Sequence, residues 1–176
     1  MKTRNKLLAL LLAMVMALGL MIPAAAAEGT APADTSGKIV ILHTNDVHCG
    51  IDQTTKDDAI TGIGYAGVAA YKAEMEAAYG ASSVTLVDAG DAIQGGPIGT
   101  LTKGSAIVEI MNKTGYDLAI PGNHEFDYGM DNFLSLATEK AEYSYICSNF
   151  TDLDGKAVFE PYKMLTYGDV KVAYVG

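Results

Sequence analysis

The sequence is poor in tryptophan, cysteine and positive charge. Its 176 residues include no Trp, 2 Cys, and 12 Lys+Arg against 21 Asp+Glu, a net charge of −9. Two cysteines without a C-x-x-C pair exclude a disulfide scaffold and a zinc knuckle. The shortage of cations excludes nucleic-acid binding through a basic patch. The 49% of hydrophobic residues exclude a disordered chain, so a single domain of ordinary size remains.

Residues 1–27 have the layout of a secretory signal peptide. Three cations among the first six residues precede an uninterrupted apolar run at 7–22, which is followed by Pro23 and four alanines. This order predicts cleavage after Ala27. The alternative is an uncleaved anchor, but the run is shorter than the about 20 apolar residues of a spanning helix. We therefore expect a secreted, extracytoplasmic protein (periplasm or cell surface) with no stable membrane span after cleavage.

Export bears on the charge and the cysteines of the mature chain. Cleavage removes three cations and no anion, which lowers the net charge from −9 to −12. Disulfides are permitted outside the cytoplasm. Cys49 and Cys147 could therefore pair, or both could be small buried thiols, and we expect free thiols.

Residues 28–37 are rich in small and turn-forming residues and predict a short flexible linker. From residue 38 onward, apolar β-prone runs alternate with amphipathic stretches. The predicted strands are 38–44, 83–88, 117–120 and 143–148, the predicted helices are 64–79, 105–114 and 130–139, and 158–166 with 170–175 form a predicted hairpin. The first two strands are continuous apolar runs, typical of strands buried on both faces. The alternation predicts an α/β fold with ligands at the carboxyl ends of its strands.

Each of the first three predicted strands is followed by a cluster of polar side chains. The clusters hold Asp46 and His48, then Asp91, then Asn123, His124 and Asp127. Asp91 lies 45 residues after Asp46 and 32 residues before Asn123, and each interval accommodates one crossover unit. We therefore expect the three clusters to converge on one edge of the sheet.

The residue types in these clusters suit metal ligation. Asp46 and His48 are separated by one residue, so on extended backbone their side chains point the same way. The carboxylate of Asp91 can bridge two cations, and Asn123 offers a neutral amide oxygen. Mixed His, Asp and Asn ligation suits divalent Zn, Mn, Fe or similar ions rather than Ca or Mg. Two such ions about 3.5–4 Å apart would clamp a phosphate and generate a hydroxide nucleophile.

His124 and Asp127 form a predicted catalytic pair. They lie three residues apart, so one turn of backbone can place the carboxylate against the imidazole. Asp127 would then fix the tautomer of His124 and support its charged form. In this interpretation His124 protonates or neutralises the oxygen that leaves phosphorus.

Other polar residues near the clusters receive structural interpretations. We expect His43 to be a hydrogen-bonded histidine inside its strand, and Asp88 to bind turn amides. Cys49 could ligate metal as a thiolate, but we expect a packed thiol. We expect Glu125 to contact the metal-binding residues rather than the metal, or to lie at the surface, and not to be catalytic. The loop 94–97 could face phosphate or be an ordinary tight turn.

The three blocks resemble those of a known family. Asp46-x-His48, Gly90-Asp91 and Gly122-Asn-His-Glu125 occur in this order in the calcineurin-like metallophosphoesterases. The longer blocks, with His43-Thr-Asn ahead of Asp46, Gln94-Gly95 after Asp91, and Phe126-Asp127 at the end, are similar to the secreted 5′-nucleotidase branch, which includes UDP-sugar hydrolases and 2′,3′-cyclic nucleotide phosphodiesterases.

This resemblance implies a fold, a set of roles and a substrate class. It makes Asp46, His48, Asp91 and Asn123 the metal ligands, with Asp91 as the bridge, and His124 with Asp127 the catalytic pair. The family's fold is an α/β/β/α sandwich followed by a separate nucleotide-binding domain. The implied enzyme is a dimetal hydrolase with a nucleotide or another phosphoester as its substrate.

The sequence departs from the family after the third block. The family completes its dimetal site with downstream histidines, whereas no His follows His124 before the last residue, Gly176. We therefore expect 38–176 to be the N-terminal part of the domain, a partial α/β/β/α sandwich. Four ligand groups cannot fill the shells of two ions, so this chain is predicted to bind metal weakly and to have little activity. The alternative function is a noncatalytic surface or binding protein on a decayed version of this fold.

Overall fold

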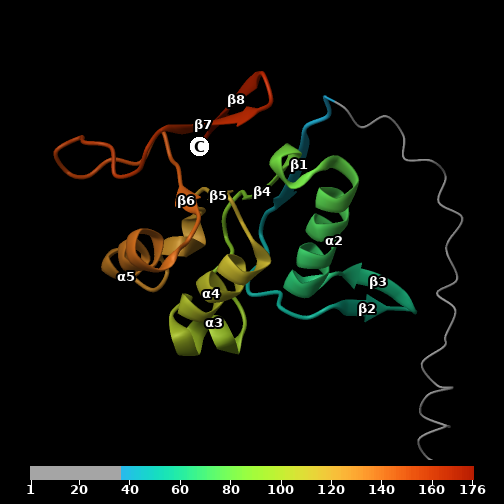
Figure 1. The fold of residues 1–176 in the computed structure, drawn as a ribbon. Helices are drawn as coiled ribbons and strands as arrows, with labels where there is room; N and C mark the ends of the chain where they lie inside the picture. The colour runs from blue at the N-terminus through green and yellow to red at the C-terminus, as the bar shows by residue number, and fades with distance from the viewer. Residues whose placement is uncertain (1–36) are drawn as a thin grey trace, which may run out of the picture. The chain divides into compact units, whose positions relative to one another are not determined.

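The computed structural model describes residues 37–176, so the expected signal peptide and residues 28–36 of the expected linker lie outside it. The core is a parallel sheet in which the strands follow the order β1-β4-β5-β6 (Figure 1). Their bounds are β1 Val40–Thr44, β4 Val84–Asp88, β5 Leu118–Ala119 and β6 Ser144–Tyr145. The predicted α/β class and parallel sheet are therefore confirmed.

The two long parallel strands differ in burial. β4 lies between two neighbours and is buried along most of its length, as its apolar run predicts. β1 is the edge strand of the described sheet and alternates between half-buried and exposed residues, with Ile41 48% exposed. The prediction that β1 is buried on both faces is wrong, and so is the interpretation of His43 as an interior histidine, because that side chain is exposed.

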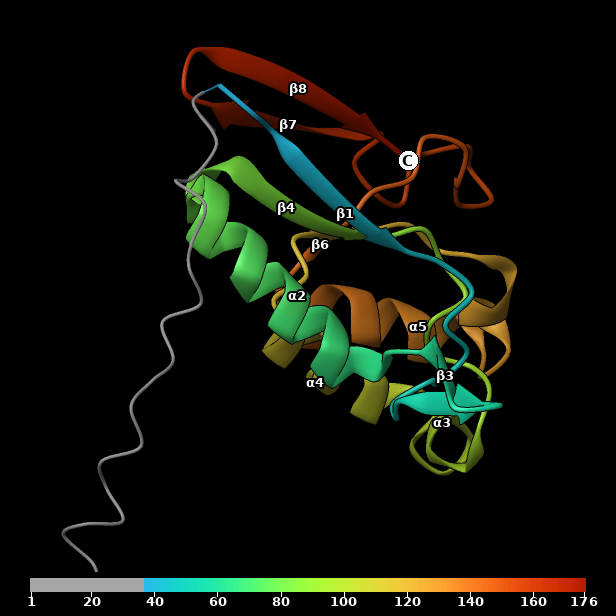
Figure 2. The same ribbon diagram turned by 90° about the vertical axis from the view of Figure 1, so that its right-hand side faces the viewer.

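Helices cover one face of the sheet (Figure 2). The helical segments are α2 Gly64–Tyr79, η1 Ala81–Ser83, α3 Pro97–Thr102, α4 Ser105–Thr114, η2 Asn123–Phe126 and α5 Met130–Ser135, which continues as the π-helical turn η3 Leu136–Lys140. Of these, α2 and α4 have the predicted bounds, and α3 was not predicted. Ile107 and Met111 of α4 lie four residues apart on one face and are fully buried together with Leu86 and Phe133. Each such burial contributes about 1.5–3 kcal/mol to folding. Among the described residues, no helix has the length and apolar character needed to cross a membrane.

Two antiparallel hairpins complete the fold. β7 (Tyr162–Tyr167) and β8 (Val170–Val175) pair around the predicted turn at 168–169 and lie on the face of the sheet opposite the helices (Figure 2). There the hydroxyl of Tyr167 hydrogen-bonds the hydroxyl of Thr85 in β4. The resulting order is a helix layer, a parallel sheet and a second small sheet, which are layers of the expected sandwich. The other hairpin, β2 (Thr54–Lys56) with β3 (Ala59–Gly62), was not predicted.

Candidate metal centre

The loops after β1 and β4 run side by side at the carboxyl edge of the sheet. The backbone N–H groups of Asp46, His48 and Cys49 donate to the carbonyl oxygens of Gly90, Asp91 and Ala92, each at 3.0 Å. These bonds continue the pairing of the two strands beyond their ends. They place His48 beside Asp91, as convergence of the strand ends predicts.

Three of the predicted site residues have left-handed backbone. The φ angles are 52° at Asp46, 45° at His48 and 60° at Asp91. Positive φ is uncommon outside glycine, and aspartate and histidine adopt it more often than most residues do. The extended backbone expected at Asp46 and His48 is therefore wrong, because both residues have left-handed φ angles.

Two glycines let the loops after β4 and β5 touch. A Cβ on Gly90 would lie 2.6 Å from the backbone nitrogen of Gly122, and a Cβ on Gly122 would collide with the Asp91 carboxylate. Gly90 also has a φ of 100°, so it serves both a turn and a close approach.

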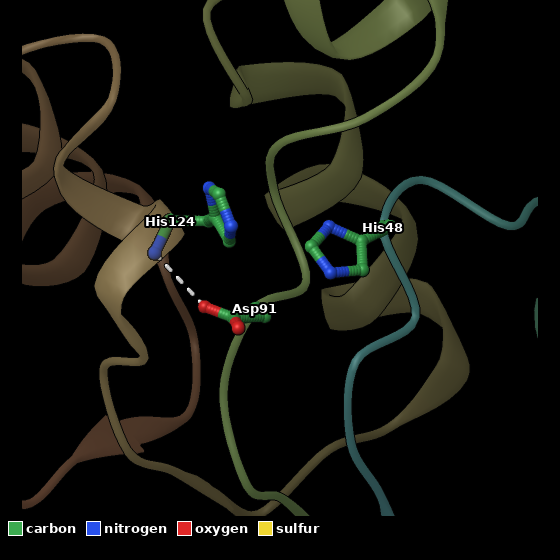
Figure 3. Close-up of side chains that lie close together, drawn as sticks. All are labelled: His48, Asp91 and His124. Carbon is green, nitrogen blue, oxygen red and sulfur yellow. Dashed lines mark hydrogen bonds between the residues drawn. The ribbon is translucent and has the colours of Figure 1, made fainter.

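His48, Asp91 and His124 meet at this edge, each from a different loop (Figure 3). One potential ligand atom of each lies within 4.8 Å of the other two. The imidazole rings are 5.1 Å apart in an edge-to-face arrangement, and the backbone N–H of His124 donates to Asp91 Oδ1 at 2.9 Å. The structure thus groups two predicted ligands with the predicted catalytic histidine.

The other predicted site residues lie in the same loops. The exposed carboxylate of Asp46 accepts a hydrogen bond from Asn45 Nδ2 at 2.7 Å and is outside the group of three described above. Asn123 begins η2 directly before His124 and is exposed. Asp127 follows η2, and its Oδ2 lies 2.8 Å from His124 Nδ1, the contact that the three-residue spacing predicts.

Hydrogen bonds assign the tautomers of both histidines. His48 Nδ1 lies 3.1 Å from the carbonyl oxygen of Gln94, which can only accept, so Nδ1 carries a proton and Nε2 is the ring nitrogen that remains for a ligand. His124 Nδ1 donates to Asp127 in the same way. This hydrogen bond raises the pKa of His124 above its ordinary value, and the charges of Asp127, Asp91 and Glu125 add to the effect.

This donor set fits a divalent cation. A metal-ligating histidine typically donates its second ring N–H to a carbonyl or a carboxylate, as His48 does to the carbonyl of Gln94. Imidazole nitrogens together with a carboxylate are suitable ligands for Zn, Mn or Fe.

Two buried carboxylates lie behind the centre. Asp88 accepts from the Gly90 N–H at 2.9 Å and from Thr44 Oγ1 at 2.6 Å, which confirms its role at the turn. Its burial, at 3% exposed, raises its pKa to about 6. Glu125 is 1% exposed, so the surface alternative for it is wrong. Sequence reasoning missed the partner hydroxyl of Thr44, although this residue directly precedes the first cluster.

Both cysteines are buried free thiols, as expected. Cys49 Sγ donates to the carbonyl of Ile93 at 3.3 Å, and desolvation raises the pKa of its thiol. A raised pKa opposes thiolate ligation, so the packed-thiol interpretation is favoured. In the loop 94–97, the Gln94 carbonyl orients His48, and Gly95 packs so closely on His48 that a Cβ would meet its carbonyl.

Comparisons with known proteins agree with this geometry. A family model described as "Calcineurin-like phosphoesterase" matches residues 39–174. A snake venom 5′-nucleotidase of Gloydius brevicauda is 36% identical over 151 residues, which are 80% of this chain and 25% of that protein. A 5′-nucleotidase of Bos taurus is 35% identical over 156 residues, 82% of this chain and 27% of that protein.

Solved structures give the same result. A 5′-nucleotidase precursor from Thermus thermophilus superposes with a TM-score of 0.66 at 26% identity, covering 78% of this chain and 28% of that one. The NAD nucleotidase of Haemophilus influenzae gives a TM-score of 0.66 at 28% identity, covering 78% and 29%.

The chain spans about a quarter of the length of the curated relatives it matches. Within that span, the family model covers the strands, the loops and all six predicted site residues. The chain therefore belongs to the calcineurin-like phosphoesterase family.

Proposed function

We propose that this protein is a metal-dependent phosphoester hydrolase of the 5′-nucleotidase type. The observation that carries the proposal is the convergence of His48, Asp91 and His124 from three loops onto one point. Relatives that are 34–36% identical are named 5′-nucleotidases, which supports nucleotides as the substrate class.

The proposed cofactor is a pair of divalent ions, Zn, Mn or similar. Asp46, His48, Asp91 and Asn123 are the residues that would hold the ions, with Asp91 as the residue that both ions would share. When bound, such ions stabilise charge on the phosphate and lower the pKa of water to make a nucleophile at neutral pH. The hydrogen bond from the His124 backbone holds the Asp91 carboxylate in one orientation.

His124 is the proposed general acid. Asp127 holds its Nδ1–H, so Nε2 remains free to point at the substrate. The pKa of His124 is raised by Asp127, which increases the protonated fraction near neutral pH. The protonated ring can then donate to the oxygen that leaves phosphorus.

The proposed setting is outside the cytoplasm. We assign 1–27 to a cleaved signal peptide, 28–37 to a linker and 38–176 to the N-terminal part of the metallophosphoesterase domain. The supporting observation is the order of cations, apolar run and alanines in the sequence. N-terminal sequencing of the exported protein should give Glu28 as the first residue, and a product that retains residues 7–22 would contradict the assignment.

The hydrolase proposal is tested by Asp91→Asn in the whole protein, which is this chain together with any residues that its gene encodes after Gly176. After chelation and addition of Mn²⁺, the wild type should hydrolyse AMP and bis-p-nitrophenyl phosphate. Asp91→Asn should lose at least about 100-fold of this activity, because outer partners alone are worth about 10–100-fold. Asp131→Asn alters an exposed carboxylate in the first turn of α5 and should change nothing. Metal binding without hydrolysis would support the noncatalytic alternative.

A further inference from the structure

We propose that Glu125 is the positioning residue of the metal centre: its buried carboxylate clamps the loop of Asp91 to the loop of His124. The inference rests on the proposed function in one respect, namely that metal binds between these loops. Glu125 touches no substrate in this proposal. It acts through the backbone of the residues that do.

Both oxygens of the Glu125 carboxylate accept hydrogen bonds from backbone N–H groups. Oε2 accepts from the N–H of Asp91 at 2.8 Å and of Gly122 at 2.6 Å. Oε1 accepts from the N–H of Ala92 at 2.8 Å and of Ile93 at 3.4 Å. Three of these donors belong to the loop after β4 and one to the loop after β5. A single side chain therefore joins two separate loops.

The groups around the Glu125 oxygens are hydrogen-bond donors, so each of the two oxygens has to be a hydrogen-bond acceptor. Its four partners among the described residues are all N–H donors, and the side chain is 1% exposed. An ionised carboxylate accepts on both oxygens, whereas an amide side chain would turn an NH₂ group toward a backbone N–H. A buried charge is tolerated only when it is hydrogen-bonded, and successive backbone amides form an anion-binding concavity.

The clamp is positioned to set the metal ligands. The amide that Glu125 holds belongs to Asp91, whose φ is 60°, and the carboxylate of that residue accepts from the His124 backbone. Because Glu125 directly follows His124, these contacts close a ring through both residues. Without the hydrogen bonds to Glu125, the backbone of Asp91 could move, and the Asp91 carboxylate would no longer be held in one direction.

Asp88, the other buried carboxylate, has a different task. It accepts one amide, that of Gly90, and the hydroxyl of Thr44, so it ties the ends of β1 and β4. Among these buried carboxylates, Glu125 is the one that reaches the loop after β5. Replacement of Asp88 and replacement of Glu125 should therefore affect the site differently.

The test is Glu125→Gln in the same whole protein that the hydrolase test uses, with Glu142→Gln, an exposed glutamate, as the matched control. In the metal-free protein, hydrogen exchange measured by NMR should speed up about 10-fold or more at the amides of Asp91, Ala92 and Gly122. The affinity for Mn²⁺ should fall about 10–100-fold, and the absorption spectrum of added Co²⁺ should shift. The far-UV circular dichroism should not change, and the control should behave as the wild type.

A second variant separates positioning from folding. Glu125→Asp keeps the charge on a shorter side chain and should restore part of the exchange protection and of the Mn²⁺ affinity. Unchanged exchange and affinity in Glu125→Gln would overturn the inference while leaving the hydrolase proposal intact. Wild-type protein that binds no Mn²⁺ would overturn the metal role and the proposed function together. Unfolding of both variants would overturn the inference by showing that the carboxylate supports the fold as a whole.

Discussion

Asp88→Asn should stabilise the metal-free protein at neutral pH. The folded-state pKa of Asp88 is raised from 3.8 to about 6 by burial, so the folded chain binds this proton more tightly than the unfolded chain does. The carboxyl is neutral in both states below about pH 3.8, and there is no penalty there. As the pH rises from about 4 to 6 the unfolded state ionises first, and the free energy of unfolding falls. Above about pH 6 the penalty is complete and constant.

The size of this effect follows from the shift. A difference of about two pKa units corresponds to about 3 kcal/mol, and the side chain is 3% exposed, so solvent screens it little. Asparagine keeps the acceptor for the Gly90 N–H and can donate to Thr44 Oγ1, whose own proton can turn to the Tyr116 hydroxyl at 2.8 Å. The hydrogen bonds are therefore conserved while the buried charge is removed.

The assay is urea unfolding followed by circular dichroism in EDTA, from pH 4 to pH 8. The difference between variant and wild type should be smallest near pH 4 and should grow to as much as about 3 kcal/mol in favour of Asp88→Asn by pH 7. A difference that does not change with pH, or a variant less stable than the wild type at pH 7, would refute the reasoning.

Three further predictions concern the metal centre. Gly122→Ala puts a methyl group into the Asp91 carboxylate and should lower Mn²⁺ affinity at least about 10-fold, measured by calorimetry, whereas Gly96→Ala, which meets no atom within 4 Å, should not. His124→Ala should lower kcat of the whole protein about 100-fold or more with Mn²⁺ affinity nearly unchanged; a parallel loss of affinity would make His124 a ligand instead. Asp127→Asn removes the main cause of the raised pKa of His124, so the alkaline limb of the pH–rate profile should move to lower pH, and an unmoved limb would contradict that role.

Local signals in the sequence were sufficient for α2, α4 and the C-terminal hairpin. α2 and α4 end at the predicted residues because Gly80 and Gly115 follow them with φ angles of 87° and 83°, a conformation that favours glycine. α3 could also have been predicted, because Pro97 stands at its first position, a typical helix start. The β2–β3 turn gave a weaker signal, since its left-handed residues are two aspartates, 57 and 58, rather than Asn-Gly.

The sequence predicted that His48, Asp91 and His124 would come together, but it did not predict which residues hold their loops in place. Parallel strands bring their ends together, so spacing alone indicated that His48 and Asp91 would approach His124. The burial of Glu125 depends on backbone amides from another loop, and any sequence provides such amides. The exposure of β1 depends on which strand lies at the edge of the sheet, which is settled only by tertiary structure.

The left-handed backbone at Asp46, His48 and Asp91 restricts which replacements are informative. Asparagine adopts this conformation readily, whereas valine, isoleucine and threonine resist it. Asn in place of either aspartate therefore changes the charge and leaves the path of the chain intact. A β-branched replacement alters both at once, so its loss of function would carry no information about coordination. When every residue type is tested at these positions, each result should be compared with that of the asparagine variant, because residue types differ in how readily they adopt left-handed backbone.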